Sequence, residues 1–156
     1  MITIKRSPTA DTRTCDWSKV TRDQLLSSSH QHISDVESGL SFFSDELFEA
    51  SDRHDHDKIT DIDSFLRDFQ TGFKEHEWWD NHRKVNRHHL NMADGVPSDV
   101  NLIDVIEHVV DCVMAGAARS DKGTAGVYEI KLPDEVLRAA LANTVEMLKR
   151  NVQVDP

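Results

Sequence analysis

The chain has 156 residues, with 28 acidic and 18 basic side chains and a formal charge of −10 when the histidines are neutral. This length fits one domain that buries about two-thirds of its unfolded surface, and the acidic balance argues against binding nucleic acid or an anionic membrane through bulk charge. The N-terminus lacks the apolar segment of a signal peptide, and the longest apolar stretch, 109–118, is too short to span a bilayer. We therefore expect a single cytoplasmic domain over residues 1–156.

The N-terminal third predicts an extended arm followed by helices. Residues 1–20 are irregular by composition, with a short strand at Met1–Lys5. Thr21 followed by Gln24 is typical of a capping box that opens a helix. From His32 onward, apolar residues recur at steps of four and three, which predicts the buried face of an amphipathic helix. These residues are Val36, Leu40, Phe43, Leu47 and Ala50.

Further helices are expected in the middle of the chain. One covers Asp61–Phe73, and its inward side chains are Ile62, Phe65, Leu66 and Phe69. Another begins at Trp78-Trp79 and ends near Asn91, with the tryptophan pair in the core or in a dimer contact rather than stacked on bases. Residues 93–97 form a turn by composition.

Two strongly apolar helices are expected toward the C-terminus. Ser98 or Asp99 caps the first, over 102–118, which contains Cys112 and predicts a buried free thiol there rather than a disulfide with Cys15. A loop over 119–132 follows, with a small strand at 127–132. Pro133 then suits the first turn of a last helix over Asp134–Asn151. The fold class is therefore all-α, with about five to six helices and a minor extended N-terminal segment.

The helix over 102–118 has an apolar side and a polar side. The polar side carries Asp104, Glu107, His108 and Asp111. It is either a solvated acidic face or a face that looks into a functional site, and the nearby histidines raise the weight of the second interpretation.

All nine histidines lie between His30 and His108. In chain order the candidate ligands read His32, His54-Asp55, His82, His88-His89 and Asp111. Neutral imidazoles and carboxylates bind borderline divalent metals such as Mn, Fe, Zn, Co and Ni. The pattern therefore predicts a metal-centred site.

His54-Asp55-x-x-Lys58, preceded by a helical histidine and followed by His82, His88-His89 and Asp111, resembles the HD-domain metal-dependent phosphohydrolase superfamily. Most similar is a group of short HD-like proteins of phages and bacteria with the motifs H-x-x-x-V, HDxSK, H-x-x-x-N-x-HH and E-x-x-x-D. Here the corresponding segments are 32–36, 54–58, 82–89 and 107–111, with Asp57 in place of the serine of HDxSK. The resemblance covers 32–118 and leaves the arm at 1–20 and the helix at 133–151 outside it. A phage-encoded chain would act in the host cytoplasm.

A second likeness, to the cyclic-di-GMP hydrolysing branch, fails in detail. The run from His88 to Pro97 is similar to the HHE…DG…P run of that branch, but Leu90 stands where that branch has an acidic residue, and the GYP tripeptide is missing. That substrate therefore does not follow.

The resemblance implies roles for individual residues. His54, Asp55 and Asp111 would hold a first ion, with Asp55 as a bridge to a second. A second ion, or phosphate if only one ion is present, would be bound by His82, His88 and His89. Asp55 and Lys58 would be the catalytic pair, with Lys58 on the phosphoryl group. The supporting residues would be Glu107 or Asp104, which orient histidine N–H groups, and the phosphate contacts Arg83, Lys84 and Arg87.

His32 is a conditional ligand. It precedes His54 by 22 residues, which in an unbroken helix is about 33 Å. It can share an ion with His54 only if the helix breaks near Gly39 or Ser51 or if a second subunit completes the site; otherwise it is a packed core histidine. The remaining histidines, His30, His56, His76 and His108, are expected at the surface or at helix caps.

The expected function is a metal-dependent phosphohydrolase that uses one or two divalent ions and metal-activated water on a small nucleotide, a nucleoside mono- or triphosphate. Two alternatives stay open: a di-iron oxygenase of HD type, and a non-catalytic helical module that metal stabilises and that binds a partner. The expected partner is a small phosphorylated substrate, and the tryptophan pair is compatible with a homo-oligomer.

Overall fold

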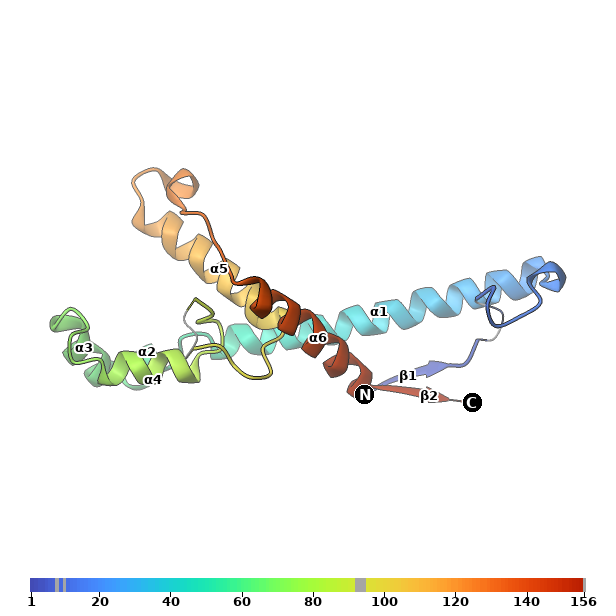
Figure 1. The fold of residues 1–156 in the computed structure, drawn as a ribbon, viewed down its shortest axis with the longest axis horizontal. Helices are drawn as coiled ribbons and strands as arrows, with labels where there is room; N and C mark the ends of the chain where they lie inside the picture. The colour runs from blue at the N-terminus through green and yellow to red at the C-terminus, as the bar shows by residue number, and fades with distance from the viewer. Residues whose placement is uncertain (8, 10, 92–94, 156) are drawn as a thin grey trace. The chain divides into compact units, whose positions relative to one another are not determined.

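The computed structural model describes residues 1–7, 9, 11–91 and 95–155 (Figure 1). Its described part contains six α-helices and one two-stranded sheet. The helices are α1 (Arg22–Arg53), α2 (Asp57–Thr60), α3 (Ile62–Gln70), α4 (Glu77–Val85), α5 (Leu102–Arg119) and α6 (Asp134–Asn151), with 3-10 turns η1 (Trp17–Lys19) and η2 (Gly123–Gly126), and the strands are β1 (Ile2–Lys5) and β2 (Val152–Asp155). The expected all-α class with a minor N-terminal strand is confirmed.

The chain divides into two compact units. Unit 1 comprises Met1–Asp45 and the chain from Glu146 onward, and unit 2 comprises Glu46–Val145. Helices α1 and α6 each contribute to both units.

In unit 1 the predicted capping box opens α1. The Thr21 backbone N–H donates to Gln24 Oε1 at 2.9 Å, and the Gln24 N–H donates to Thr21 Oγ1 at 3.3 Å. The helix then runs unbroken to Arg53, where the sequence predicted two separate helices. Strand β1 pairs in parallel with β2, which the sequence did not predict, and Ile2 lies opposite Val152.

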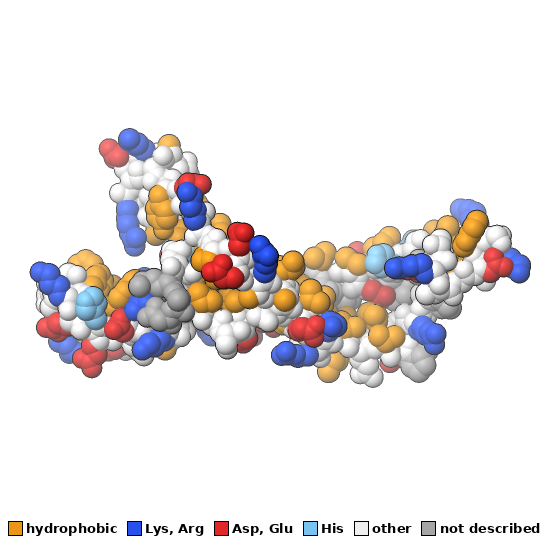
Figure 2. Space-filling model, in the orientation of Figure 1, with side chains coloured by type: hydrophobic (Ala, Val, Ile, Leu, Met, Phe, Trp, Pro, Cys, Tyr) orange, Lys and Arg blue, Asp and Glu red, His pale blue; other side chains and the backbone are white. Residues whose placement is uncertain are grey.

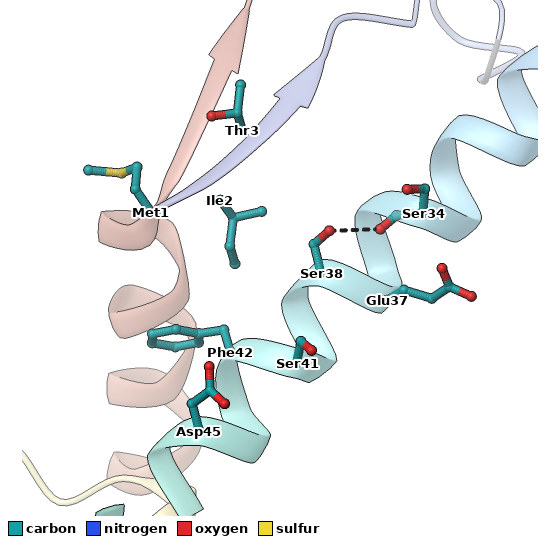
Figure 3. Close-up of a pocket in the computed structure, with 9 residues that line it drawn as sticks. All are labelled: Met1, Ile2, Thr3, Ser34, Glu37, Ser38, Ser41, Phe42 and Asp45. Carbon is teal, nitrogen blue, oxygen red and sulfur yellow. Dashed lines mark hydrogen bonds between the residues drawn. The ribbon is translucent and has the colours of Figure 1, made fainter.

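A groove of about 480 Å³ lies between β1 and α1 in unit 1 (Figure 3). From the helix, Ser34, Ser38, Ser41 and Phe42 line it, and from the strand, Met1 to Thr3. The sheet therefore faces a largely polar side of α1.

Unit 2 contains an apolar core built on four buried residues: Leu90, Val100, Val136 and Ala140. Leu90 is fully buried, and a carboxylate at this position would lose its hydration inside an apolar cluster. This explains why leucine follows the paired histidines. Helix α6 begins after Pro133, as predicted, and supplies Val136 and Ala140 to this core.

Helix α5 is capped by Asn101, not by Ser98 or Asp99. The Asn101 side chain accepts the Ile103 N–H at 2.8 Å, and Asp104 accepts the Asn101 N–H at 2.8 Å. The polar side of α5 faces inward: Asp104 and His108 are 2% and 3% exposed, whereas Ile106 is 45% exposed. Of the two interpretations of this helix, the structure agrees with the one in which the polar face looks into the protein.

Several predicted burial patterns are wrong. Val36 and Leu40 on α1 are 46% and 65% exposed. On α3 the side chains of Ile62, Leu66 and Phe69 are exposed, and only Phe65 turns inward, where its ring stacks on Trp78 with centroids 4.3 Å apart. Periodicity identified these helices correctly, but it could not show that a single chain leaves part of their apolar faces uncovered.

Of the smaller predictions, some are confirmed and others are wrong. The described residues 127–132 form no strand. The turn predicted over 93–97 lies partly outside the described residues, at 93 and 94. Both cysteines are free, and Cys112 is buried as predicted. Within the described ranges, no helix combines the length and apolarity needed to cross a membrane.

Candidate metal centre

The site begins where α1 ends. Asp55 follows the last turn of the helix with a φ of 53°, in the left-handed region that residues other than glycine rarely occupy and that Asp and Asn tolerate best. Its backbone N–H donates to the side-chain oxygen of Asn86 at 3.1 Å. This reversal directs His54 and Asp55 toward residues 82–89, and strained backbone of this kind is concentrated at functional sites.

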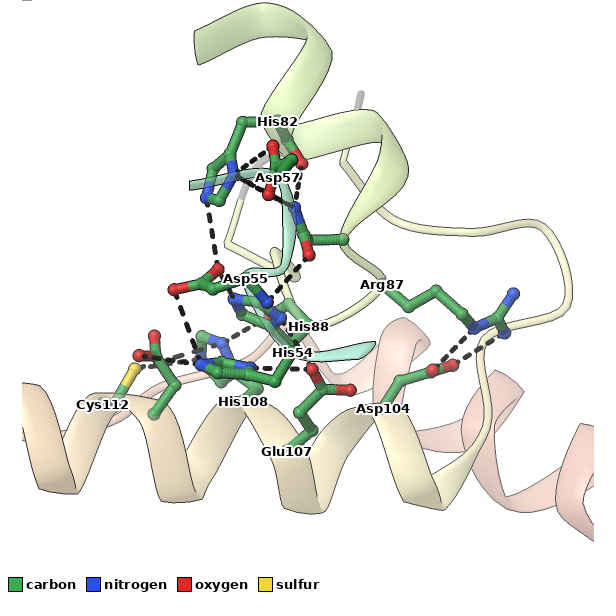
Figure 4. Close-up of polar contacts among 12 residues, drawn as sticks. His54, Asp55, Asp57, His82, Arg87, His88, Asp104, Glu107, His108 and Cys112 are labelled. Carbon is green, nitrogen blue, oxygen red and sulfur yellow. Dashed lines mark hydrogen bonds and ion pairs between the residues drawn. The ribbon is translucent and has the colours of Figure 1, made fainter. Parts of the chain in front are cut away.

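Two groups of potential ligands share one carboxylate. The first ligand group is His54, Asp55 and His88, and the second ligand group is Asp55, His82 and His89. Within each group the ligand atoms lie within 4.8 Å of one another. Asp55 Oδ1 is 3.4 Å from His82 Nε2 and 3.6 Å from His88 Nε2, while Asp55 Oδ2 is 3.5 Å from His54 Nε2 (Figure 4). Both groups lie in unit 2.

Four polar atoms of these groups are buried and have no hydrogen-bond partner among the described residues. They are Asp55 Oδ1 and the Nε2 atoms of His82, His88 and His89. Each such atom costs about 1–3 kcal/mol when it stays unsatisfied. All four belong to the two ligand groups, and within each group the ligand atoms lie close enough together to hold a cation. Imidazole nitrogens and a carboxylate oxygen are the donors that a borderline divalent metal accepts, so the residues fit such an ion.

Carboxylates outside the centre fix the imidazole orientations. Glu107 Oε1 lies 2.9 Å from Nδ1 of both His54 and His88, and Asp57 Oδ2 lies 2.8 Å from Nδ1 of His82 (Figure 4). Because an ionised carboxylate only accepts hydrogen bonds, Nδ1 of each ring carries the proton, and the Nε2 lone pair faces the centre. Histidines that bind metals usually have such a partner.

The titratable groups are held in the forms that bind a cation. Burial lowers the pKa of His89 to about 3, with further lowering by the nearby His88 and His82. Burial also lowers the pKa of His82, more than Asp57 raises it. These imidazoles are therefore neutral at physiological pH.

The acidic groups stay ionised. Burial raises the pKa of Asp55, but the hydrogen bond and positive charge of Lys58 outweigh that effect, so the pKa is below its usual value. Burial likewise raises the pKa of Glu107, and the hydrogen bonds from His88 and His54 more than compensate. With His82 and His89 neutral and Asp55 ionised, these ligands can bind metal without first releasing protons.

Lys58 and Asp111 lie at the edge of the centre. The Lys58 ammonium donates to Asp55 Oδ2, and its side chain is about one-third exposed. Asp111 Oδ1 is 3.8 Å from His54 Nε2 and belongs to neither ligand group. The first ligand group therefore contains His88, which the sequence had assigned with His82 and His89, and Asp111 lies beside that group.

His32 does not join the centre. It is exposed on α1, and the helix has no break near Gly39 or Ser51. The helix break that His32 would need in order to be a ligand in its own chain is therefore not present, and the exposed side chain contradicts the alternative of a packed core histidine.

Asp104 and Arg87 form an ion pair with each other. Arg87 Nε donates to Asp104 Oδ1 at 2.7 Å, and Arg87 Nη1 donates to Asp99 Oδ1 at 3.0 Å. The hydrogen bonds to Asp104 raise the pKa of Arg87 despite its partial burial. Asp104 thus holds the start of α5, and its hydrogen bonds within the described chain go to Arg87 and Asn101, which contradicts its predicted role as a histidine orienter.

The other predicted phosphate contacts lie on α4. Arg83 is 7% exposed and donates to Asp80 Oδ1 at 2.7 Å, whereas Lys84 is exposed. The Arg83 side chain is therefore buried in the protein, and the Arg87 side chain is paired with Asp104 and Asp99. Of the three predicted phosphate contacts, Lys84 is exposed and Arg87 is partly exposed, with 36% of its side chain open to solvent.

Three positioning residues were not predicted from the sequence. Asp57 orients His82. Asn86 holds the Asp55 backbone and donates to Asp57 Oδ1 at 2.9 Å. His108, expected at the surface, is buried and donates from Nδ1 to the backbone oxygen of His88 at 2.8 Å. The asparagine inside the H-x-x-x-N-x-HH motif was the available signal for Asn86, whereas His30, His56 and His76 are exposed as expected.

Gly95 allows the second ligand group to be closely packed. A Cβ atom at this position would lie 2.4 Å from the backbone oxygen of His89. The close approach therefore requires glycine.

Comparison with known proteins finds no matching family model, no matching curated protein and no matching solved structure.

Proposed function

We propose that this protein is a metal-dependent phosphohydrolase that acts on a small nucleotide, a nucleoside mono- or triphosphate. The observation that carries the proposal is the convergence of Asp55 Oδ1 with three buried, unpartnered imidazole nitrogens. Asp55 belongs to both ligand groups, which is the arrangement expected of a carboxylate that bridges two ions. The order of these residues along the chain resembles that of the HD-domain phosphohydrolases.

The number of ligands favours catalysis over a purely structural metal. A structural zinc is closed by four protein ligands, whereas a catalytic ion keeps a position open for water or substrate. Each ligand group supplies three residues. Divalent ions bound there would lower the pKa of water and polarise a phosphoryl oxygen.

Lys58 makes a phosphoryl substrate a better fit than a neutral one. Its ammonium lies against the shared carboxylate at a partly exposed position. An ion bound to Asp55 would compete with Lys58 for that carboxylate, and the ammonium would then be available to an incoming phosphoryl oxygen. Glu107 and Asp57 would meanwhile keep the Nε2 atoms of His54, His88 and His82 directed inward.

The test combines elemental analysis with phosphate release from a panel of nucleoside mono- and triphosphates supplied with Mn, Co or Ni. We expect the wild-type chain to retain metal and release phosphate, and Asp55→Asn to lose both. Asparagine keeps the size of the side chain and tolerates the left-handed backbone, so the loss would reflect the missing charge. Asp121→Asn, at an exposed position, is the matched control and should behave like the wild type.

An unchanged rate of phosphate release by Asp55→Asn would overturn the proposal. Iron in the purified protein together with a near-UV charge-transfer band would instead indicate the oxygenase alternative. Bound metal that raises the melting temperature, with no turnover of any nucleotide, would indicate the non-catalytic module.

A further inference from the structure

One face of α1 in unit 1 is apolar and uncovered. Its apolar side chains lie at positions 26, 33, 36, 40 and 43, and the polar Ser29 occupies the step between 26 and 33. Steps of three and four that alternate in this way form the a and d positions of a heptad repeat. Leu26, Ile33, Val36 and Leu40 are 45%, 55%, 46% and 65% exposed. We call these four residues with Phe43 the α1 stripe.

The sheet of unit 1 does not cover the α1 stripe. The groove between β1 and α1 is lined on the helix by Ser34, Glu37, Ser38, Ser41, Phe42 and Asp45 (Figure 3). None of these belongs to the stripe. Figure 2 shows apolar side chains open to solvent along the span that α1 occupies in Figure 1.

Unit 1 lacks an apolar core of its own. Ile2 is the one apolar side chain that is buried among the described residues of this unit. An isolated two-stranded sheet is marginal in water, and a helix gains most of its stability in a protein from packing its apolar face. A single copy of unit 1 therefore lacks the packing of the apolar helix face that would stabilise it most.

We propose that two copies of this chain associate through the α1 stripe as a helical coiled coil. A second copy presents the same heptad spacing, so its apolar residues match those of the first in period and length. The charges beside the stripe also permit self-association. Although the chain has a net charge of −10, the e and g positions between residues 26 and 43 hold one carboxylate, Glu37, with His30 and His32 on the same edges. The acidic residues Asp35 and Asp45 lie at c and f, away from the contact.

This association would bury apolar area that a single chain exposes. It would leave the ligand groups unchanged, because all their residues belong to unit 2. The inference is therefore independent of the proposed function, and either can fail alone.

The test measures the solution mass of the full-length chain by light scattering over a range of concentrations. We expect twice the chain mass of 17.7 kDa for the wild type, and one chain mass for the double variant Ile33→Lys/Leu40→Lys. Both positions are exposed in a single copy, so lysine there disturbs no internal packing. The matched control is Phe48→Lys: Phe48 is 67% exposed on the same helix but lies at a b position, and this variant should keep the doubled mass.

A wild-type mass of one chain at every concentration would overturn the proposal, and so would a double variant that retains the doubled mass. If the two lysine substitutions unfold α1, the helical circular dichroism signal will be lost. The wild-type concentration series and Phe48→Lys then test the proposal. A doubled mass in both supports the stripe, and loss of the doubled mass in Phe48→Lys contradicts it. Metal content measured in parallel should be the same in all three proteins.

Discussion

At the scale of single residues, Glu107 has the most consequential contacts outside the ligand groups. One carboxylate oxygen accepts hydrogen bonds from two imidazoles that reach the centre from different segments, His54 at the end of α1 and His88 after α4. Its low pKa keeps it ionised. It therefore fixes both the tautomer and the orientation of two ligands of the first group.

Glu107→Gln tests this role with little change in side-chain volume. The amide oxygen carries no charge and accepts the two imidazole N–H groups more weakly than the carboxylate does, so we expect metal affinity to fall about 10- to 100-fold. Calorimetric titration with Mn or Zn measures the change. Glu135→Gln, at an exposed position on α6, serves as control, and equal affinities for the two variants would argue against the orienting role.

At the scale of elements, the placement of α4 depends on a carboxylate from α3. Asp68 is 3% exposed, and its two oxygens accept the backbone N–H groups of His76 at 3.2 Å and Trp79 at 3.0 Å. Backbone N–H groups at the start of a helix have no acceptor within the helix itself, and an N-cap side chain normally accepts their hydrogen bonds. Because His82 lies on α4, the cap from Asp68 also determines where this ligand lies.

Asp68→Ala removes both acceptors and leaves two backbone N–H groups without partners. We expect the free energy of unfolding to fall by about 1–3 kcal/mol, measured by urea denaturation, and the metal affinity to fall with it. Asp52→Ala, an exposed acidic residue on α1, should change stability by less than about 0.5 kcal/mol. Similar losses for the two variants would show that the cap contributes little.

At the scale of the whole molecule, the core and the ligand groups lie in the same unit. Leu90, Val100, Val136 and Ala140 pack in unit 2, and Leu90 directly follows the last histidine of the second ligand group. Metal binding at the centre should therefore stabilise the unit that carries the core. A ligand that binds only the folded state stabilises it in proportion to the logarithm of its concentration over Kd.

Removal of metal tests this linkage. At a metal concentration 100 times Kd, binding adds about 2.7 kcal/mol, which for a chain of this size corresponds to roughly 5–10 °C in Tm. We expect a chelator to lower Tm by this amount and excess Mn or Zn to restore it, measured by differential scanning calorimetry. A Tm that is the same with and without chelator would indicate that the unpartnered imidazoles do not hold an ion.

The sequence by itself determined most of the helical segments and the cap that opens α1. The spacing of apolar residues and local capping chemistry placed α6 within its observed bounds and opened α1 at Thr21, because these signals act within a few residues. The sequence also singled out Asp55, His82, His88 and His89, because few residue types bind transition metals.

Only the tertiary structure decided which of these residues meet. The left-handed turn at Asp55 brings a single carboxylate to both ligand groups, and pairs His88 with His54. His32, on an unbroken α1, belongs to neither ligand group, and Asp104 pairs with Arg87. Burial was equally undetermined, since apolar periodicity marks a face that must be covered but does not say whether the same chain or a second copy covers it. Such contacts join residues that are far apart in the chain, so the local spacing of residues could not predict them.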